Sequence, residues 1–322
     1  MLKEKGFIDE PLPSGMNPTE AINKLRKEKN AVILSHFYVK AELQDIADYV
    51  GDSLGLAQAA AQTDAEMIVF VGVHFMAETA KIINPLKKVI LPDLNSSCSL
   101  AESAPAEEFA RFKAKHPGHK VITYINATAA LKTMSDIVCT SANAKKIVES
   151  FPKNEKLIFA PDKNLGNYIN SITGRNMVLW DGACIVHEQY SLEKIIDLMD
   201  KYPDAEFIAH PECTKPVLTL AKHIGSTTSL LNYIKKSSNR KFIVATESGI
   251  LHQMNRACPE KIFIPAPPID STCGCNDCFY MKLNNMKKLY LSMKYEQPEV
   301  ILPPDVIEKA QIPIKRMLEI SR

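Results

Sequence analysis

Three stretches of this chain begin a repeated layout: AVILSHFY (Ala31–Tyr38), KVITYIN (Lys120–Asn126) and EFIAHPE (Glu206–Glu212). A helix-start pattern follows each of them, namely VGDSLGLAQAA from Val50, VCTSANAKKIV from Val138 and IGSTTSLLNYI from Ile224. The interval from His36 to Tyr124 is 88 positions, and the interval from Tyr124 to His210 is 86. The same intervals, 88 and 86, separate Ser53, Ser141 and Thr227. We therefore interpret the chain as three copies of one folding unit.

Within each copy, short β-branched and apolar runs alternate with segments of helix length. This alternation is typical of an α/β fold with parallel sheets covered by helices on both faces. In the first copy it predicts strands over Ala31–His36, Tyr49–Gly51, Met67–Val71 and Lys88–Leu91. We place the three repeats at residues 1–104, 105–190 and 191–282, and expect a C-terminal helical segment, 283–322, to pack back on the first repeat. Its last helix, from Asp305, is expected to be interrupted at Pro313.

Length and composition exclude several classes of protein. A chain of 322 residues exceeds the usual size of a single core, and its 46% hydrophobic and 24% charged residues are ordinary for a globular protein. A formal net charge of +2 provides no electrostatic argument for binding nucleic acid or an anionic membrane. The longest apolar run, Met67–Val73, is too short to cross a bilayer. The first residues lack the apolar core of a secretory signal, so we expect a cytoplasmic protein.

Three of the eight cysteines follow the last strand of a repeat: Cys98, Cys184 and Cys278. If the copies pack around a pseudo-threefold axis, these three thiolates converge. Three thiolates without an obvious fourth protein ligand suit a 4Fe–4S cluster with one open iron. Tetrahedral zinc is the structural alternative, although it normally takes a fourth ligand.

The other cysteines receive different expectations. Cys139, Cys213 and Cys258 lie within or beside helical patterns and are expected to be small buried apolar residues. Cys273 and Cys275 precede Cys278 in a CxCxxC run, and we treat them as accessory to it.

Polar and aromatic side chains end the first strand of each copy. Residues i and i+2 of a strand share a face, so each pair is expected to point into one space: His36 with Tyr38, Tyr124 with Asn126, and His210 with Glu212. His210 and Glu212 could exchange protons, and Tyr38 or Tyr124 could donate to a developing oxyanion. The simpler interpretation is that each is a hydrogen-bonded structural residue.

Ser53, Ser141 and Thr227 stand where a helix is predicted to begin in each copy. They can serve as N-caps with no further function. Alternatively, the unpaired N–H groups at such helix starts bind carboxylate or phosphate, and three of them facing one cavity would suit a small polyanion. No GxGxxG or GxxxxGK[ST] motif follows a strand, so neither a dinucleotide fingerprint nor a P-loop is present.

These motifs resemble those of the quinolinate synthase family. The resemblance covers nearly the whole chain: SHFY at Ser35, GDSL at Gly51, HFMAETAKI at His74, YIN at Tyr124, TSAN at Thr140, WDGACIVHE at Trp180, HPEC at His210, GST at Gly225 and ATE at Ala245. It implies three homologous three-layer α/β/α sandwich domains around a pseudo-threefold axis. It also implies a 4Fe–4S cluster on Cys98, Cys184 and Cys278. The CxCxxC spacing departs from the CxxCxxC of some members.

The resemblance further implies an activity and a set of site residues. The reaction condenses iminoaspartate with dihydroxyacetone phosphate to give quinolinate in de novo NAD biosynthesis, with the open iron as Lewis acid and with possible functional coupling to L-aspartate oxidase. Tyr38, His210 and Glu212 are the expected catalytic residues. The expected substrate-binding residues are His36, Ser53, Tyr124, Asn126, Ser141, His210, Glu212 and Thr227. A zinc-dependent lyase or hydrolase and a cluster-based redox sensor are the alternative functions.

Overall fold

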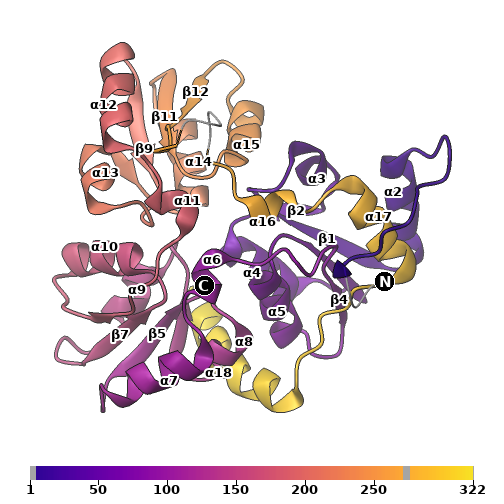
Figure 1. Ribbon diagram of the computed structural model, residues 1–322, viewed down its shortest axis with the longest axis horizontal. Coiled ribbons are helices and arrows are strands. Elements are labelled where there is room, and N and C mark those ends of the chain that lie inside the picture. Colours follow the sequence, from indigo (N-terminus) through magenta and orange to yellow (C-terminus); the bar gives the residue numbers. More distant parts are fainter. Residues whose placement is uncertain (1–4, 271–275, 322) are drawn as a thin grey trace. The chain divides into compact units, whose positions relative to one another are not determined.

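The computed structural model describes residues 5–270 and 276–321 (Figure 1). Its strands form three four-stranded parallel sheets, ordered β2-β1-β3-β4, β6-β5-β7-β8 and β10-β9-β11-β12. The order is the same in all three, with the first strand of each repeat inside its sheet. This confirms the predicted α/β class and the triplication. Cys273 and Cys275 lie outside the described residues.

The first repeat contains strands at the predicted positions. All five residues of the β3 strand are buried, as expected where helices cover both faces of a parallel sheet. The elements up to the end of this repeat are α2 (Pro18–Glu28), β1 (Ala31–His36), α3 (Ala41–Ile46), β2 (Tyr49–Gly51), α4 (Ser53–Gln62), β3 (Met67–Val71), α5 (His74–Ile83), β4 (Lys88–Ile90) and α6 (Ser99–Glu102).

The last strand of the second repeat, β8, is shorter than the last strands of the other two repeats, and the short helix α11 follows it. Asp162 caps α10 by accepting the N–H of Leu165 at 2.7 Å, and Gly174 ends that helix in the left-handed conformation. The elements are α7 (Ala106–Ala114), β5 (Lys120–Tyr124), α8 (Ala129–Lys132), β6 (Ile137–Cys139), α9 (Ala144–Glu149), β7 (Leu157–Ala160), α10 (Lys163–Thr173), β8 (Val178–Leu179) and α11 (Ile185–Glu188).

The third repeat has its own apolar core, in which Phe207 and Ile243 of the sheet pack with Ile195 and Val217 of the covering helices. Its elements are α12 (Leu192–Lys201), β9 (Glu206–Ala209), α13 (Lys215–Leu220), β10 (His223–Ile224), α14 (Thr227–Lys236), β11 (Lys241–Ala245), α15 (Ile250–Ala257) and β12 (Ile262–Pro265).

Three C-terminal helices follow: α16 (Phe279–Lys282), α17 (Met286–Tyr295) and α18 (Pro304–Ile320). α17 packs on α2, and α18 packs on α5 and α8. The segment between them pairs with the edge of the first sheet, where the N–H of Val300 donates to Val89 at 2.8 Å. The C-terminal segment thus packs on helices and the edge strand of the first repeat and on α8 of the second.

By density of internal contacts the chain divides into two units. Unit 1 consists of the residues up to Glu102, Ile125–Val138 and the residues from Phe279 onward. Unit 2 consists of Ser103–Tyr124 and Cys139–Cys278. The boundaries placed at 104, 190 and 282 divide the chain by sequence repeat, which is a different criterion, and they stay predictions.

The predicted N-caps are displaced by one or more residues. Asp52 caps α4 by accepting from Gly55 N at 3.1 Å, and Ser226 caps α14 by accepting from Ser229 N at 3.3 Å. Ser53 and Thr227 are instead the first residues inside those helices. Ser141 lies in the turn before α9. The interpretation of these three residues as N-caps is therefore wrong: Asp52 and Ser226 take that role in α4 and α14, and Asn143 occupies the N-cap position of α9.

The predicted interruption at Pro313 is also wrong, since α18 runs through it. An interior proline costs about 3 kcal/mol of helix stability. Here Pro313 belongs to the buried face of the helix together with Ala310, Ile314 and Met317. Burial of this face against α5 and α8 offsets that cost. In the described part of the chain, we find no helix with the length and apolarity needed to cross a membrane.

The docking of α18 can be tested by two isoleucines on one helix. Ile314 is fully buried, whereas Ile312 is 68% exposed. Ile314→Ala should lower the free energy of unfolding by about 2–4 kcal/mol, because it leaves a cavity in the packed face. Ile312→Ala should change it by less than about 0.5 kcal/mol. Urea denaturation compares the two variants, and equal effects would contradict this packing.

Candidate active site

The predicted site residues are divided between the two units, and each group is described by itself. Unit 1 contains His36, Tyr38, Ser53, Cys98 and Asn126. Unit 2 contains Tyr124, Ser141, Cys184, His210, Glu212, Thr227 and Cys278.

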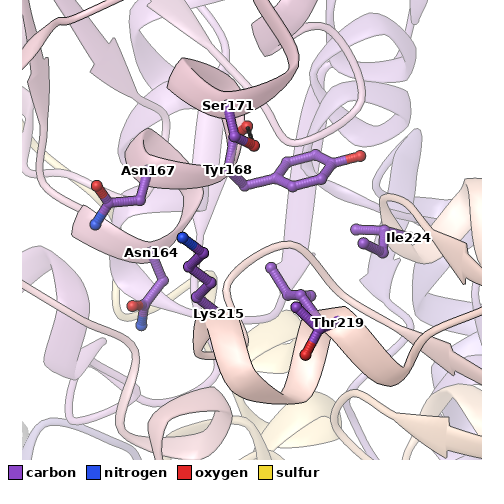
Figure 2. A pocket seen from close by; sticks show the side chains of 8 residues that line it. Asn164, Asn167, Tyr168, Ser171, Lys215, Thr219 and Ile224 are labelled. Atoms are coloured by element: carbon purple, nitrogen blue, oxygen red, sulfur yellow. Dashed lines mark hydrogen bonds between the residues drawn. The ribbon is translucent and has the colours of Figure 1, made fainter.

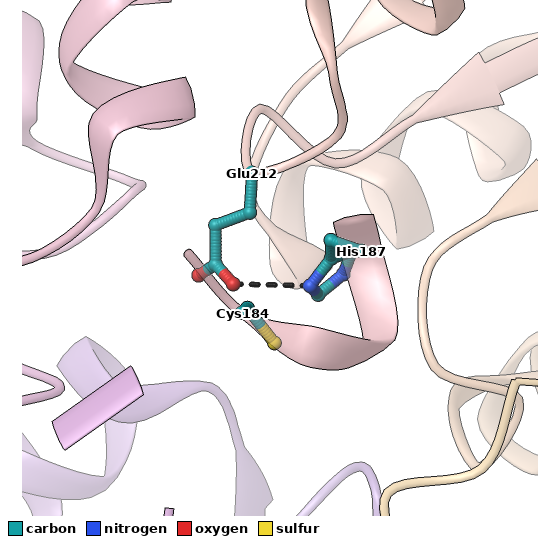
Figure 3. Close-up of side chains that lie close together, drawn as sticks. All are labelled: Cys184, His187 and Glu212. Atoms are coloured by element: carbon teal, nitrogen blue, oxygen red, sulfur yellow. Dashed lines mark ion pairs between the residues drawn. The ribbon is translucent and has the colours of Figure 1, made fainter. Parts of the chain in front are cut away.

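In unit 2, Glu212 is the centre of a buried group of polar side chains. Its carboxylate follows β9 and is only 3% exposed. The hydroxyl of Tyr124, the last residue of β5, donates to Oε1. Nδ1 of His187, on α11, forms an ion pair of 3.0 Å with Oε2 (Figure 3). We call Tyr124, Ser141, His187, His210 and Glu212 the Glu212 cluster.

His210 is held in one orientation and one tautomer. Its Nδ1 accepts the backbone N–H of Glu212 at 3.3 Å, so the neutral ring carries its proton on Nε2. Nε2 lies 3.2 Å from the hydroxyl of Ser141. The ring also stacks on that of His187, with 4.7 Å between centroids. His210 is therefore built to donate a hydrogen bond from Nε2.

The pKa values of two buried groups in the cluster are shifted. Burial lowers the pKa of His210 to about 3. Burial alone would raise the pKa of Glu212, but His187 and His210, together with the hydroxyl of Tyr124, lower it to about 2. At neutral pH the cluster therefore holds an ionised carboxylate beside a neutral imidazole. This combination can accept a proton at one atom and donate a hydrogen bond at another.

Asp162 lies near the Glu212 cluster, and its pKa is shifted in the opposite direction to that of Glu212. It is fully buried at the start of α10. Burial and the negative charge of Glu212 raise the pKa of Asp162 well above its usual range. The surroundings therefore favour the ionised form of Glu212 and disfavour the ionised form of Asp162.

In unit 1, the end of β1 repeats the backbone geometry found at His210. Nδ1 of His36 accepts the backbone N–H of Tyr38 at 3.2 Å, and the two rings meet edge to face at 4.5 Å. Lys282 secures the same turn by donating to the carbonyl of Tyr38 at 2.8 Å. The side-chain oxygen of Asn126 is buried and has no hydrogen-bond partner among the described residues. An unpaired buried amide of this kind fits a ligand-binding role.

The described cysteines fall into two classes of exposure. Cys98, Cys184 and Cys278 are partly exposed, whereas Cys139, Cys213 and Cys258 are buried. Burial raises the pKa of the thiols of Cys139 and Cys213, which disfavours the thiolate needed for metal binding. The prediction that Cys139, Cys213 and Cys258 are buried is confirmed. The partly exposed three are those predicted as ligands.

Two buried residues fix the backbone around Cys278. Glu247 is fully buried and accepts the N–H of Cys278 at 3.1 Å and that of Gly249 at 2.7 Å. Asn276 donates to the carbonyl of Val186 at 3.1 Å. Because Val186 belongs to the helix that begins after Cys184, this hydrogen bond ties the segments that carry the two cysteines.

One set of donors in unit 2 could hold a metal. A ligand atom from each of Cys184, His187 and Glu212 lies within 4.8 Å of the others. Thiolate, imidazole and carboxylate are donors that zinc and iron accept. Together with the partly exposed cysteines, this donor chemistry fits a metal-dependent site.

Sequence reasoning assigned no role to His187, although its side chain is 2% exposed and contacts Glu212. It also did not predict Thr246, whose hydroxyl lies 3.1 Å from Nε2 of His187. A usable signal was present for His187, which stands three positions after Cys184. On a helix, this spacing places both residues on one side. Thr246 had no comparable signal.

The tautomer and charge of His210 can be tested by pH titration. An unfolded chain protonates this imidazole near its ordinary pKa of 6.5, whereas the folded chain keeps it neutral down to about pH 3. The unfolded state therefore binds more protons in this window, and the folded state loses stability as the pH falls through it. In NMR of ¹³C-histidine-labelled protein, the His210 signal, assigned with His210→Gln, should not move from about pH 8 to about pH 5. A midpoint near the ordinary value would contradict the assignment.

Comparison with known proteins identifies the family. The family described as "NadA: Quinolinate synthetase A protein" matches residues 20–319. The chain is 58% identical over 301 residues to a quinolinate synthase of Synechococcus sp., with 94% of each chain covered. It is 59% identical over 302 residues to that of Gloeothece citriformis, covering 94% of this chain and 93% of the relative. It is 57% identical over 311 residues to that of Thermosynechococcus vestitus, covering 97% of both. This chain therefore belongs to the quinolinate synthase family of enzymes.

Proposed function

We propose that this chain is a quinolinate synthase that condenses iminoaspartate with dihydroxyacetone phosphate. The products are quinolinate, one phosphate and two waters, which balances the atoms of the two substrates. The observation that carries the proposal is the Glu212 cluster, in which a buried ionised carboxylate contacts a tyrosine hydroxyl and two histidines. Condensation followed by dehydration requires several proton transfers, and this cluster provides groups for them.

Each residue of the cluster has a defined task in the proposal. Glu212 takes a proton from the condensing substrate and is stabilised as an anion by Tyr124 and His187. His210 donates a hydrogen bond from Nε2 to a substrate oxygen, since its Nδ1 is occupied by the N–H of Glu212. Ser141, 3.2 Å from that nitrogen, holds the imidazole until substrate replaces its hydroxyl.

The predicted residues of unit 1, and Thr227 of unit 2, bind and orient the substrates in the same proposal. Tyr38 is the third catalytic residue, held by His36 and Lys282 at the end of β1. Asn126 contributes its unpaired buried amide oxygen. Ser53 and Thr227, at the starts of α4 and α14, lie where helix N–H groups favour anions. Both substrates are anions, so this arrangement suits them.

Cys98, Cys184 and Cys278 would hold a 4Fe–4S cluster with one iron open. Two observations support this proposal. The three cysteines are partly exposed, in contrast to the buried ones, and the hydrogen bond from Asn276 to Val186 joins the segments that carry Cys184 and Cys278. When bound, such a cluster supplies a Lewis acid for the loss of a hydroxyl group. The proposal places the enzyme in the cytoplasm, with iminoaspartate supplied by L-aspartate oxidase.

A single zinc ion is the second candidate for the metal. The observation in its favour is the proximity of Cys184, His187 and Glu212, which offer sulfur, nitrogen and oxygen. In that case Glu212 would be a ligand and could not act as the base. Metal analysis separates the two candidates.

Iron and sulfide analysis of protein purified without oxygen tests the cluster. The wild-type chain should contain about four irons and four acid-labile sulfides. Cys184→Ala should lose the intact cluster, whereas Cys258→Ala should keep it, because Cys258 is buried. A colourless, zinc-loaded wild-type protein would overturn the cluster assignment.

The role of Glu212 can be separated from metal binding. Glu212→Gln keeps the size and one acceptor but removes the charge. It should retain iron and sulfide while lowering quinolinate formation at least about a hundredfold, the usual scale for a general acid or base. Quinolinate is measured from enzymatically generated iminoaspartate and dihydroxyacetone phosphate. Unchanged turnover would remove Glu212 from the chemistry, and loss of metal would favour its role as a ligand.

A further inference from the structure

A cavity in unit 2 lies between α10 and α13 (Figure 2). Its volume is about 410 Å³. Pockets for small molecules usually measure roughly 300–1,000 Å³. None of the residues lining it belongs to the Glu212 cluster or to the predicted site residues. The cavity is therefore large enough for a small ligand and is not part of the site described above.

Three polar groups at this cavity have no partner. Among the described residues, we find no hydrogen bond or ion pair to the amine of Lys215, the amide of Asn167 or the hydroxyl of Tyr168. In Figure 2 the Lys215 side chain extends from α13 toward α10, which carries Asn167 and Tyr168. One cation and two neutral polar groups are thus available to a ligand.

The remaining lining residues are of two kinds: Asn164, Ser171 and Thr219 are polar, whereas Leu218 and Ile224 are apolar. Leu218 is buried, Ile224 is partly buried, and the ring of Tyr168 extends toward Ile224 (Figure 2). In the part of the chain that the structure describes, no acidic side chain lines the cavity, and Lys215 is its only charged residue. The site therefore suits a ligand with one negative group and a flat apolar body. A phosphate ion has no apolar part and would leave Leu218 and Ile224 without a contact.

We propose that the cavity between α10 and α13 binds a small aromatic carboxylate. The carboxylate pairs with Lys215, and the ring packs against Tyr168, Leu218 and Ile224. A hydroxyl or amide on the ring can reach Asn167. This inference does not depend on the proposed function, because it uses no residue of the Glu212 cluster.

The test uses 4-hydroxybenzoate as the probe, with 4-hydroxybenzamide and inorganic phosphate as controls. Isothermal titration with the full chain should show saturable binding of the carboxylate. Lys215→Ala should weaken it about tenfold or more, the effect of losing one charge-assisted contact. The amide and phosphate should bind at least about tenfold more weakly than the carboxylate.

Two further variants test whether binding depends on the position of the lysine and on the space inside the cavity. Lys236 is exposed on α14 of the same unit, and Lys236→Ala should leave binding unchanged. Thr219, also exposed, lines the cavity, and Thr219→Trp should fill it and abolish binding without disturbing the core. Absence of saturable binding, equal binding of the amide, or unchanged binding by Lys215→Ala and Thr219→Trp would overturn the proposal. Equal binding of inorganic phosphate would overturn the assignment of an aromatic ligand.

Discussion

The burial of the Glu212 carboxylate is the constraint on which the rest of the cluster depends. An ionised carboxyl group removed from water must be paired and hydrogen-bonded, or it becomes protonated. Here the hydroxyl of Tyr124 and the imidazole of His187 provide the pairing, and they come from β5 and α11. The partners of Glu212 thus belong to the second repeat, whereas Glu212 belongs to the third. The buried charge of Glu212 therefore depends on the packing of two repeats within unit 2.

Much of the fold and part of this site follow from local sequence. The strands Ala31–His36 and Met67–Val71 have the predicted bounds, because β-branched runs of that length are distinctive. The pairing of Tyr124 with Glu212 could not be predicted, since it joins two sheets 88 positions apart. The capping of α4 by Asp52 was missed because two adjacent residues, Asp52 and Ser53, are both good caps.

His187 illustrates a different limit of sequence reasoning. It lies on a four-residue helix, too short to show the periodicity that identifies a helix face. Apart from its spacing from Cys184, only burial distinguishes it from a surface histidine, and burial results from tertiary packing. The same holds for the cysteines. Position within the repeat indicated Cys98, Cys184 and Cys278, and exposure then separates them from Cys139, Cys213 and Cys258.

The α10 helix connects the two sites of unit 2. Its N-cap, Asp162, is affected by the charge of Glu212, and its outer side carries Asn167 and Tyr168. Coupling between the sites would require a second arrangement of α10 that a ligand could favour. Asp162, however, is fully buried and hydrogen-bonded to Leu165, and moving it would expose or unpair a carboxyl group. The packing of α10 therefore favours one arrangement, so the cavity and the Glu212 cluster are best regarded as independent sites.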